Sequence, residues 1–481
     1  MIADLKPYPE YKDSGLPWLG RVPSHWEVRQ ARHVGRMLKG SGGSKADAVA
    51  HGVPCVRYGE LYTTHNNFIK RAKSFVTEDC ALTYTAILYG DVLFAASGEK
   101  MEEIGKSAVN LLREPAVCGG DVIILRPFDV SAAAFLGYAT DSHGLAYQKA
   151  TMGRGTTIKH VYPDELRNLT IPLPPPSEQA AIVRFLDWAN GRLERAIRAK
   201  RKVIALLHEQ KQAIIHKAVT QGLDPKVPKR DSGIPWLGEI PSHWEVRRLK
   251  HCTTLIEQGW SPQCDAQPAE GNEWGVLKVG CVNKDTFRPE QNKKLPEALR
   301  PDLGLEIRDG DILVSRANTR ELLGLAALAE KPPAKRLLCD KLFRFRAKRE
   351  VFDEKFLVFV LRSKPCRQQI ESSTNGASTS MQNIGQGVLK NLWLASPNVA
   401  EQKQIVIQIT AATRPITAGI DRYEREITLL REYRTRLVAD VVTGKLDVRE
   451  VALSLPEEDV VLASKDVVDE VDEPELEEGE G

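Results

Sequence analysis

The sequence contains no apolar run that approaches the roughly 18 residues needed to span a membrane. Its first residues, MIADLKPYPEYKDSG, lack the apolar core of a signal peptide, so we expect a cytoplasmic protein without a membrane partner. Hydrophobic residues at 42% and charged residues at 27% argue against collagen-like, wholly disordered and membrane classes. At about 150 residues per domain, a chain of 481 residues suggests about three domains.

Metal-binding and disulfide patterns are also missing. None of the eight cysteines belongs to a C-x-x-C pair, and the ten histidines show no metal-ligand spacing. We therefore expect neither a zinc site nor a disulfide framework. The cysteines are Cys55, Cys80, Cys118, Cys252, Cys264, Cys281, Cys339 and Cys366.

Catalytic motifs are scarce as well. Gly105-Lys106-Ser107 has the ending of a phosphate loop, but Lys100 occupies the position of its first glycine. Neither a G-x-S-x-G elbow nor an H-E-x-x-H helix occurs, and the N-P-P-[FY] or D-P-P-Y loop of adenine methyltransferases is absent. A nuclease core assembles only loosely, from Pro301-Asp302 and Asp353-Glu354-Lys355. A binding role is favoured over a stand-alone nuclease or methyltransferase, which stays open as an alternative.

Charge is distributed unevenly along the chain. Residues 457–481 hold twelve Asp or Glu against the single Lys465, a net charge of −11, which leaves 66 basic and 52 acidic side chains, or +14, in the first 456 residues. A basic body attracts polyanions, although a solvated lysine-rich surface would give the same count. The acidic tail is expected to be disordered.

A long-range repeat organises the sequence. Residues 13–34 read DSGLPWLGRVPSHWEVRQARHV and residues 231–252 read DSGIPWLGEIPSHWEVRRLKHC, with 15 of 22 positions identical. GDVLFAAS from Gly90 matches GDILVSRA from Gly310, and SEQAAIVRFL from Ser177 matches AEQKQIVIQI from Ala400. TQGLD ending at residue 224 likewise matches TGKLD ending at residue 447. The chain is thus two copies of a unit of roughly 220 residues, followed by the acidic tail.

Each copy runs from an arm through a globular block into a helical segment. The blocks, about Glu27 to Ile171 and Glu245 to Leu394, carry short strand-like runs broken by Gly and Pro, which indicates mixed α and β structure. Apolar residues at steps of three and four then predict amphipathic helices with one seam, as in a coiled-coil pair, although core packing in one large domain would give the same seam. We expect Ser177 as an N-cap, a break near Asn190-Gly191 and a matching break near Thr413-Arg414 and Pro415, and a longer helix over 192–220.

The arms concentrate aromatic residues. His25 and His243 lie in the repeated string PSHWE, beside Trp26 and Trp244, and Trp18 and Trp236 precede them. We expect these tryptophans to dock each arm onto the fold.

The arm SGLPWLGRVPSHWEV, the helices that begin at SEQ and AEQ, the TQGLD and TGKLD endings and the two-copy layout together resemble the specificity subunit of type I restriction-modification systems. The resemblance covers residues 8–450 and implies an α+β fold with pseudo-twofold symmetry. Two target recognition domains in tandem repeat would be separated by two long antiparallel coiled-coil helices. The implied boundaries are 1–26 for the arm, 27–171 for the first recognition domain, 172–230 for the first helical spacer, 231–394 for the repeated arm and second recognition domain, 395–450 for the second spacer, and 451–481 for an acidic disordered tail.

The resemblance also implies a function. Each recognition domain would read one half of a split double-stranded DNA target, and the divergent blocks make that target asymmetric, with a spacer that follows helix length. The subunit would be non-catalytic and would dock two adenine methyltransferase subunits and two restriction (helicase-nuclease) subunits. S-adenosylmethionine, ATP and magnesium would be bound only by those partners, and this chain would need no cofactor. The acidic tail departs from the family pattern.

Base and phosphate contacts require fork-shaped, amide or cationic side chains in loops near strand ends. An alternative is a coiled-coil scaffold protein without sequence-specific DNA binding, for which these would be plain surface residues. The predicted DNA-binding residues are Arg154, Thr156, Thr157 and Lys159 in the first block and Arg316, Asn318, Arg320, Gln382 and Asn383 in the second.

Overall fold

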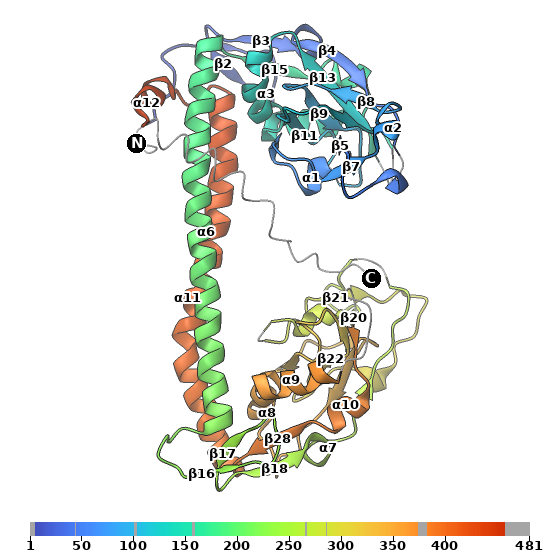
Figure 1. The fold of residues 1–481 in the computed structure, drawn as a ribbon, viewed down its shortest axis with the longest axis vertical. Helices are drawn as coiled ribbons and strands as arrows, with labels where there is room; N and C mark the ends of the chain where they lie inside the picture. The colour runs from blue at the N-terminus through green and yellow to red at the C-terminus, as the bar shows by residue number, and fades with distance from the viewer. Residues whose placement is uncertain are drawn as a thin grey trace. The chain divides into compact units, whose positions relative to one another are not determined.

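The computed structural model of the protein describes residues 5–43, 45–100, 103–155, 159–264, 267–284, 286–373 and 382–456 (Figure 1). Within these ranges the chain forms two compact units. Unit 1 contains residues 5–201 and 424–456, and unit 2 contains residues 202–423. Each unit therefore combines one globular block with part of each of two long helices, α6 (Pro176–Gln221) and α11 (Val399–Val442).

Two sheets form the block of unit 1. The larger has the order β4-β13-β9-β11-β6, in which only β11 and β6 run parallel, and the smaller has the order β7-β5-β12-β8. Helices α3 (Ala133–Thr140) and α4 (His143–Met152) follow the last long strand, and α3 packs against β9 and β11. The strands are β4 (Gly35–Lys39), β5 (Val53–Val56), β6 (Asn67–Ile69), β7 (Ser74–Val76), β8 (Thr85–Ile87), β9 (Val92–Ala95), β11 (Ser107–Asn110), β12 (Ala116–Cys118) and β13 (Val122–Pro127).

Unit 2 repeats this plan with fewer strands. Its sheets have the orders β19-β26-β22-β24 and β21-β20-β25, and helices α8 (Glu354–Arg362) and α9 (Lys364–Ser372) take the places of α3 and α4. The strands are β19 (Glu257–Gln258), β20 (Gly275–Leu277), β21 (Asn292–Lys294), β22 (Ile312–Ser315), β24 (Ala326–Leu328), β25 (Arg336–Leu337) and β26 (Leu342–Phe345). The mixed helices and strands agree with the α+β class expected from the sequence.

The repeated Gly-Asp turn explains how each central strand begins. Gly90 and Gly310 adopt φ values of +89° and +84°, which glycine tolerates without strain. The following carboxylates, Asp91 and Asp311, are buried and each accepts a backbone N–H three residues back, at 2.8 Å in both units. An arginine pairs with each carboxylate: Arg126 Nη2 lies 2.8 Å from Asp91 Oδ2, and Arg346 Nε lies 2.7 Å from Asp311 Oδ1. The turn therefore fixes the start of β9 and β22 in the same way.

Each arm forms small antiparallel pairs and ends on a buried tryptophan. In unit 1 they are β1 (Tyr11–Asp13) with β2 (Arg21–Pro23) and β3 (Glu27–Gln30) with β15 (Thr170–Leu173). In unit 2 they are β16 (Lys229–Asp231) with β17 (Glu239–Pro241) and β18 (Glu245–Arg248) with β28 (Trp393–Ser396).

A carboxylate of the adjoining helix holds each arm. Trp26 Nε1 donates to Glu178 at 2.9 Å and Trp244 Nε1 donates to Glu401 at 3.1 Å. His25 and His243 lie beside the same carboxylates, at 2.8 and 2.9 Å. Docking through Trp26 and Trp244 is thereby confirmed, whereas Trp236 remains 41% exposed.

Three sequence expectations about element boundaries were wrong. Helix α6 runs through Asn190-Gly191 without a break, because Trp188 and Ala189 are buried in the core and outweigh the low helix propensity of the next two residues. Helix α11 likewise runs through Pro415. Ser177 lies inside α6 rather than at its N-cap, since Pro176 occupies the first turn, where a missing N–H does no harm.

The third error concerns the tail. Residues 451–456 were assigned to it, but α12 (Arg449–Ser454) packs Ala452 and Leu455 into the unit 1 core, and Arg184 donates to the Leu455 carbonyl at 2.7 Å. Residues 457–481 lie outside the described residues.

Within each unit the two long helices pack against one another. In unit 1, Arg434 pairs with Glu194 at 3.1 Å, and Lys200 pairs with Glu426, so the two segments run antiparallel. In unit 2, Ile405 and Ile409 share a core with Ile215 and Val219. The seam residues of the first helix that lie in unit 1 are buried: Ile182, Leu186, Ala189, Leu193 and Ile197.

Candidate nucleic-acid interface

Beyond its buried central strand, each unit carries a short two-stranded ribbon. The first ribbon joins β10 (Ser97–Gly98) to β14 (Lys159–His160), and the second ribbon joins β23 (Ala317–Asn318) to β27 (Gln382–Asn383). Both are antiparallel: Ser97 faces His160 and Gly98 faces Lys159, while Ala317 faces Asn383 and Asn318 faces Gln382. The ribbons occupy equivalent positions of the repeat, 220 residues apart in the first strand and 223 in the second.

The first ribbon gathers part of the predicted set. Arg154 forms a bridge with His160, exchanging backbone hydrogen bonds of 2.8 and 2.7 Å. Its guanidinium, 75% exposed, pairs with Glu165 at 2.8 Å. Lys159 lies in β14 and is half-buried. Thr156 and Thr157 lie outside the described residues.

The second ribbon brings four of its five predicted residues together. Arg316 precedes β23 and donates to the Asp340 carbonyl at 3.3 Å, and its own carbonyl accepts the Ile384 N–H at 2.9 Å. Gln382 is half-buried and Asn383 is exposed. Asn318 is 8% exposed and its amide is already committed, since Nδ2 donates to Asn283 Oδ1 at 3.0 Å and Oδ1 accepts the Thr319 N–H. We therefore regard Asn318 as a support of the ribbon rather than a contact.

Two side chains of the second ribbon region, those of Gln382 and Arg320, could contact a ligand. Gln382 Oε1 is buried, with no hydrogen-bond partner among the described residues. Arg320, the fifth predicted residue, is exposed in the turn just after β23. Buried polar atoms usually have partners, so the Gln382 oxygen marks a place where a ligand or water would be favoured.

Sequence reasoning missed Ser97, Gly98 and His160. The signal was present, because Ser97 and Gly98 stand 220 residues before Ala317 and Asn318, in the block where the Gly-Asp turns already match. Ser97 is buried, and its Oγ lies 2.9 Å from His160 Nδ1. The exposed His160 ring is therefore held by a neighbour from the opposite strand.

In each unit the second helix of the block carries a buried or partly buried cation. In unit 1, Lys149 of α4 is fully buried and donates to Ser107 Oγ at 3.1 Å, with its Nζ 4.0 Å from Asp141. Burial lowers the pKa of Lys149 to about 8 against the opposing charge of Asp141, and the positive charge of Lys106 contributes to the lowering. In unit 2, Arg367 of α9 donates to the carbonyls of three residues in the turn after β23, namely Arg320, Glu321 and Leu323.

A third element lies beside each ribbon. Asn283, which accepts the Asn318 amide, directly follows a short 3-10 helix, Val279–Val282. In unit 1 the equivalent place is α1 (Glu60–Thr63), where Tyr62 and Tyr58 make an edge-to-face contact with ring centroids 6.1 Å apart. Burial raises the pKa of Tyr62, and the charges of Glu103 and Glu99, from the turn after β10, add to the effect. Aromatic side chains therefore flank the first ribbon and amides the second.

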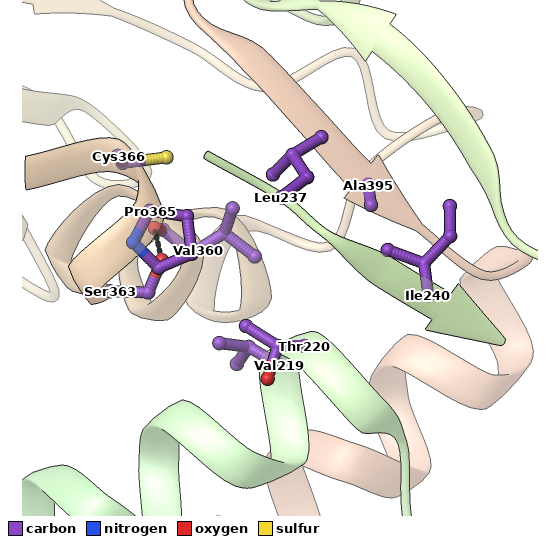
Figure 2. A pocket seen from close by; sticks show the side chains of 9 residues that line it. All are labelled: Val219, Thr220, Leu237, Ile240, Val360, Ser363, Pro365, Cys366 and Ala395. Carbon is purple, nitrogen blue, oxygen red and sulfur yellow. Dashed lines mark hydrogen bonds between the residues drawn. The ribbon is translucent and has the colours of Figure 1, made fainter. Parts of the chain in front are cut away.

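A small cavity in unit 2 does not offer a comparable surface (Figure 2). It lies between the end of α6, β17, α8, α9 and β28, and most of its lining is apolar. Its two hydroxyls are engaged: Thr220 donates to the His216 carbonyl at 2.7 Å and Ser363 donates to the Val360 carbonyl at 2.6 Å. We interpret it as a packing gap between the arm, the helix and the block.

The part of the chain that the structure describes has neither a metal-binding cluster nor a membrane-spanning helix. No group of three or more His, Cys, Asp or Glu side chains there is arranged to hold a metal ion. No helix there combines the length and apolar character required to cross a bilayer.

Comparisons with known proteins agree with this architecture. Residues 23–201 match the family model described as the type I restriction modification DNA specificity domain. The chain is 29% identical over 209 residues to the EcoEI type I restriction enzyme specificity subunit of Escherichia coli, covering 43% of this chain and 35% of that subunit. It is 23% identical over 420 residues to the EcoKI specificity subunit of E. coli K12, covering 85% of each.

A solved structure gives the same fold. One chain from a study of complex assembly and conformational transition in the type I restriction-modification system aligns with a TM-score of 0.55 at 18% identity, over 88% of this chain and 98% of that one. The repeated units and their ribbons define an α+β protein built from two tandem units of one plan. By the family-model match over residues 23–201 and by the EcoEI and EcoKI relatives, the chain is similar to the specificity subunits of type I restriction-modification systems.

Proposed function

We propose that this chain reads a bipartite, asymmetric double-stranded DNA target, with one half of the target contacted by each unit. The observation that carries the proposal is the pair of ribbons, which share their place in the repeat but differ in side chains: Lys159 and His160 in one, Gln382 and Asn383 in the other. A common scaffold with two unlike readers would select two unlike half-sites.

The ribbons have suitable size and chemistry. The major groove of B-DNA admits a two-stranded β-ribbon, and each base pair presents a distinct pattern of donors and acceptors there. Amides match the adenine edge, whereas cationic and N–H donors match guanine or phosphate oxygens. The excess of basic side chains over residues 1–456 would add attraction that does not depend on sequence.

We also propose which subunits dock on this chain and which of them carry out catalysis. Two adenine methyltransferase subunits and two helicase-nuclease restriction subunits would dock on this chain, with the methyltransferases on the long helices. Catalysis, and the binding of S-adenosylmethionine, ATP and magnesium, would belong to those partners, and this chain would be non-catalytic. The names of the EcoEI and EcoKI relatives, specificity subunits of restriction enzymes, support this division.

The test is to co-express the chain with the adenine methyltransferase subunit of the proposed complex and to map methylated adenines in the host DNA by single-molecule sequencing. We expect one split motif with two unlike halves. Replacing residues 27–171 by the corresponding block of a relative should change one half, and replacing residues 245–394 should change the other. A stable complex with equal affinity for all duplexes would favour the scaffold alternative instead.

A further inference from the structure

In each ribbon, the later strand (β14 or β27) has one exposed residue, and this residue stands at the same position in both units. Lys159 and Gln382 are half-buried, whereas the next residues, His160 and Asn383, are exposed. His160 faces Ser97 and Asn383 faces Ala317, at the same register of the two ribbons. The repeat therefore presents one exposed side chain at one fixed place, and its chemistry differs between the units.

The hydrogen bond of His160 determines which ring atom is available. Ser97 Oγ lies 2.9 Å from Nδ1, and among the described residues the Ser97 hydroxyl has no other acceptor for its proton. We assign the Ser97 hydroxyl as the donor to Nδ1 of the neutral ring, and this assignment leaves the ring proton on Nε2. In the cationic ring both nitrogens carry protons. Nε2 is a hydrogen-bond donor in either state.

Asn383 offers the opposite kind of chemistry. Its exposed amide presents a donor and an acceptor side by side and makes no side-chain hydrogen bond with another described residue. Ala317, which faces it, has no group that could hold it. An amide of this kind forms two hydrogen bonds with adenine, at N6 and N7. A single N–H donor instead suits the O6 and N7 acceptors of guanine and is opposed by the N6 amino group of adenine.

We propose that the exposed residue of β14 and the exposed residue of β27 each select one base pair of a half-site. His160, held by Ser97, selects a guanine in the first half, and Asn383 selects an adenine in the second. This inference rests on the proposed function and sharpens it, since it assigns the two halves different base chemistry.

The first measurement needs no variant of the ribbon. The half of the methylation motif that changes when residues 27–171 are replaced is the first half. It should contain a G·C pair that the protein requires, and the other half should contain a required A·T pair. A first half without any required G·C pair would overturn the assignment of His160, while the existence of a split motif would still support the proposed function.

The second measurement uses variants of the complex with the methyltransferase subunit. Affinity is measured for duplexes in which each base pair of the motif is replaced in turn. H160N should lower the discrimination at one guanine of the first half by about tenfold and leave the second half unchanged. N383H should lower the discrimination at one adenine of the second half and leave the first half unchanged. S97A should weaken the same guanine preference as H160N, because the ring loses its anchor.

H33N is the matched control, because His33 is an exposed histidine of unit 1 that lies outside the ribbon. It should keep the full base profile. The melting temperature and the recovery of each complex establish that a variant is folded. A folded H160N complex with the wild-type profile at every position would overturn the proposal, and so would an H160N effect spread equally over both halves.

Discussion

Glu178 and Glu401 are the same residue of the repeat in two different environments. Glu178 is 4% exposed and accepts hydrogen bonds from Tyr8 and Trp26, with His25 against its second oxygen. Among the described residues, the Glu401 carboxylate contacts Trp244 and His243 alone, and its side chain is 29% exposed. Burial raises the pKa of the Tyr8 hydroxyl far above its usual range, and the Glu178 carboxylate adds to this. The N-terminal arm therefore depends on one buried carboxylate.

We expect E178A to lower the free energy of unfolding of unit 1 by about 3 kcal/mol, because it leaves the buried Trp26 and Tyr8 donors without an acceptor. E401A should lower that of unit 2 by about 1 kcal/mol, since water can reach Trp244 Nε1 after the change. Calorimetric melting of the two variants and the wild type gives the comparison. Equal losses in both variants would show that burial of the carboxylate does not determine how much it stabilises its unit.

Lys149 gives a pH-dependent prediction at the same scale. Its folded pKa of about 8 lies below the value of about 10.4 for an unfolded lysine. The unfolded state therefore binds more protons between these two values, so the contribution of Lys149 to stability rises as the pH is raised through this window. Below pH 8 both states are charged and the destabilisation by burial is fully present.

K149M removes this titration, while Lys106 still pairs with Asp141. The stability of the wild type relative to K149M should therefore increase by roughly 3 kcal/mol from pH 7.5 to pH 10.5. Denaturant or thermal unfolding of both proteins at the two pH values measures the difference. A difference that stays constant with pH would mean that Lys149 keeps an ordinary pKa in the folded state.

At the scale of elements, Arg367 is the residue that holds the turn after β23. Its guanidinium donates to the carbonyls of Arg320 at 3.1 Å and Glu321 at 3.0 Å, and also to that of Leu323. A planar fork with five donors can serve several carbonyls at once, whereas a lysine ammonium cannot hold the same geometry. The turn carries the exposed Arg320.

R367A should therefore weaken selection in the second half-site about tenfold and leave the first half intact, with R367K only partly restoring it. The base-substitution profile of the methyltransferase complex is the readout, because a purely structural loss would lower affinity without changing base preference in one half alone. An unchanged profile in folded R367A would show that the turn does not take part in reading.

Elements differed in how far the sequence predicted them. The arms, the Gly-Asp turns and the helical seams were found because each occurs twice, and chance does not repeat such strings in order. The breaks at Asn190-Gly191 and Pro415 were wrong, because local propensity was judged without the buried Trp188 and its neighbours. The first ribbon was only partly found, because Ser97 pairs with His160 across 63 residues and no local pattern encodes that pairing.

For the whole molecule, the separation of charge along the chain is the property that the sequence defines most sharply. Residues 1–456 carry +14 and residues 457–481 carry −11, so the chain as a whole carries +3. Binding to DNA phosphates without sequence preference grows with the positive charge of the protein and falls steeply with salt. The acidic segment should therefore lower weak binding to every duplex while leaving base selection to the ribbons.

Deletion of residues 457–481 should raise the affinity of the methyltransferase complex for a duplex without the motif several-fold at 50 mM salt. The gain should shrink at 200 mM salt, where screening limits the reach of charges to less than about 8 Å.

A variant of full length in which all twelve acidic residues of the segment become Asn or Gln should behave like the deletion, because charge rather than length is responsible. Fluorescence anisotropy with duplexes that contain or lack the motif measures both effects, and the methylated sequence itself should not change. If the neutralised variant binds like the wild type while the deletion binds more tightly, the effect belongs to the bulk of the segment and the electrostatic explanation is wrong.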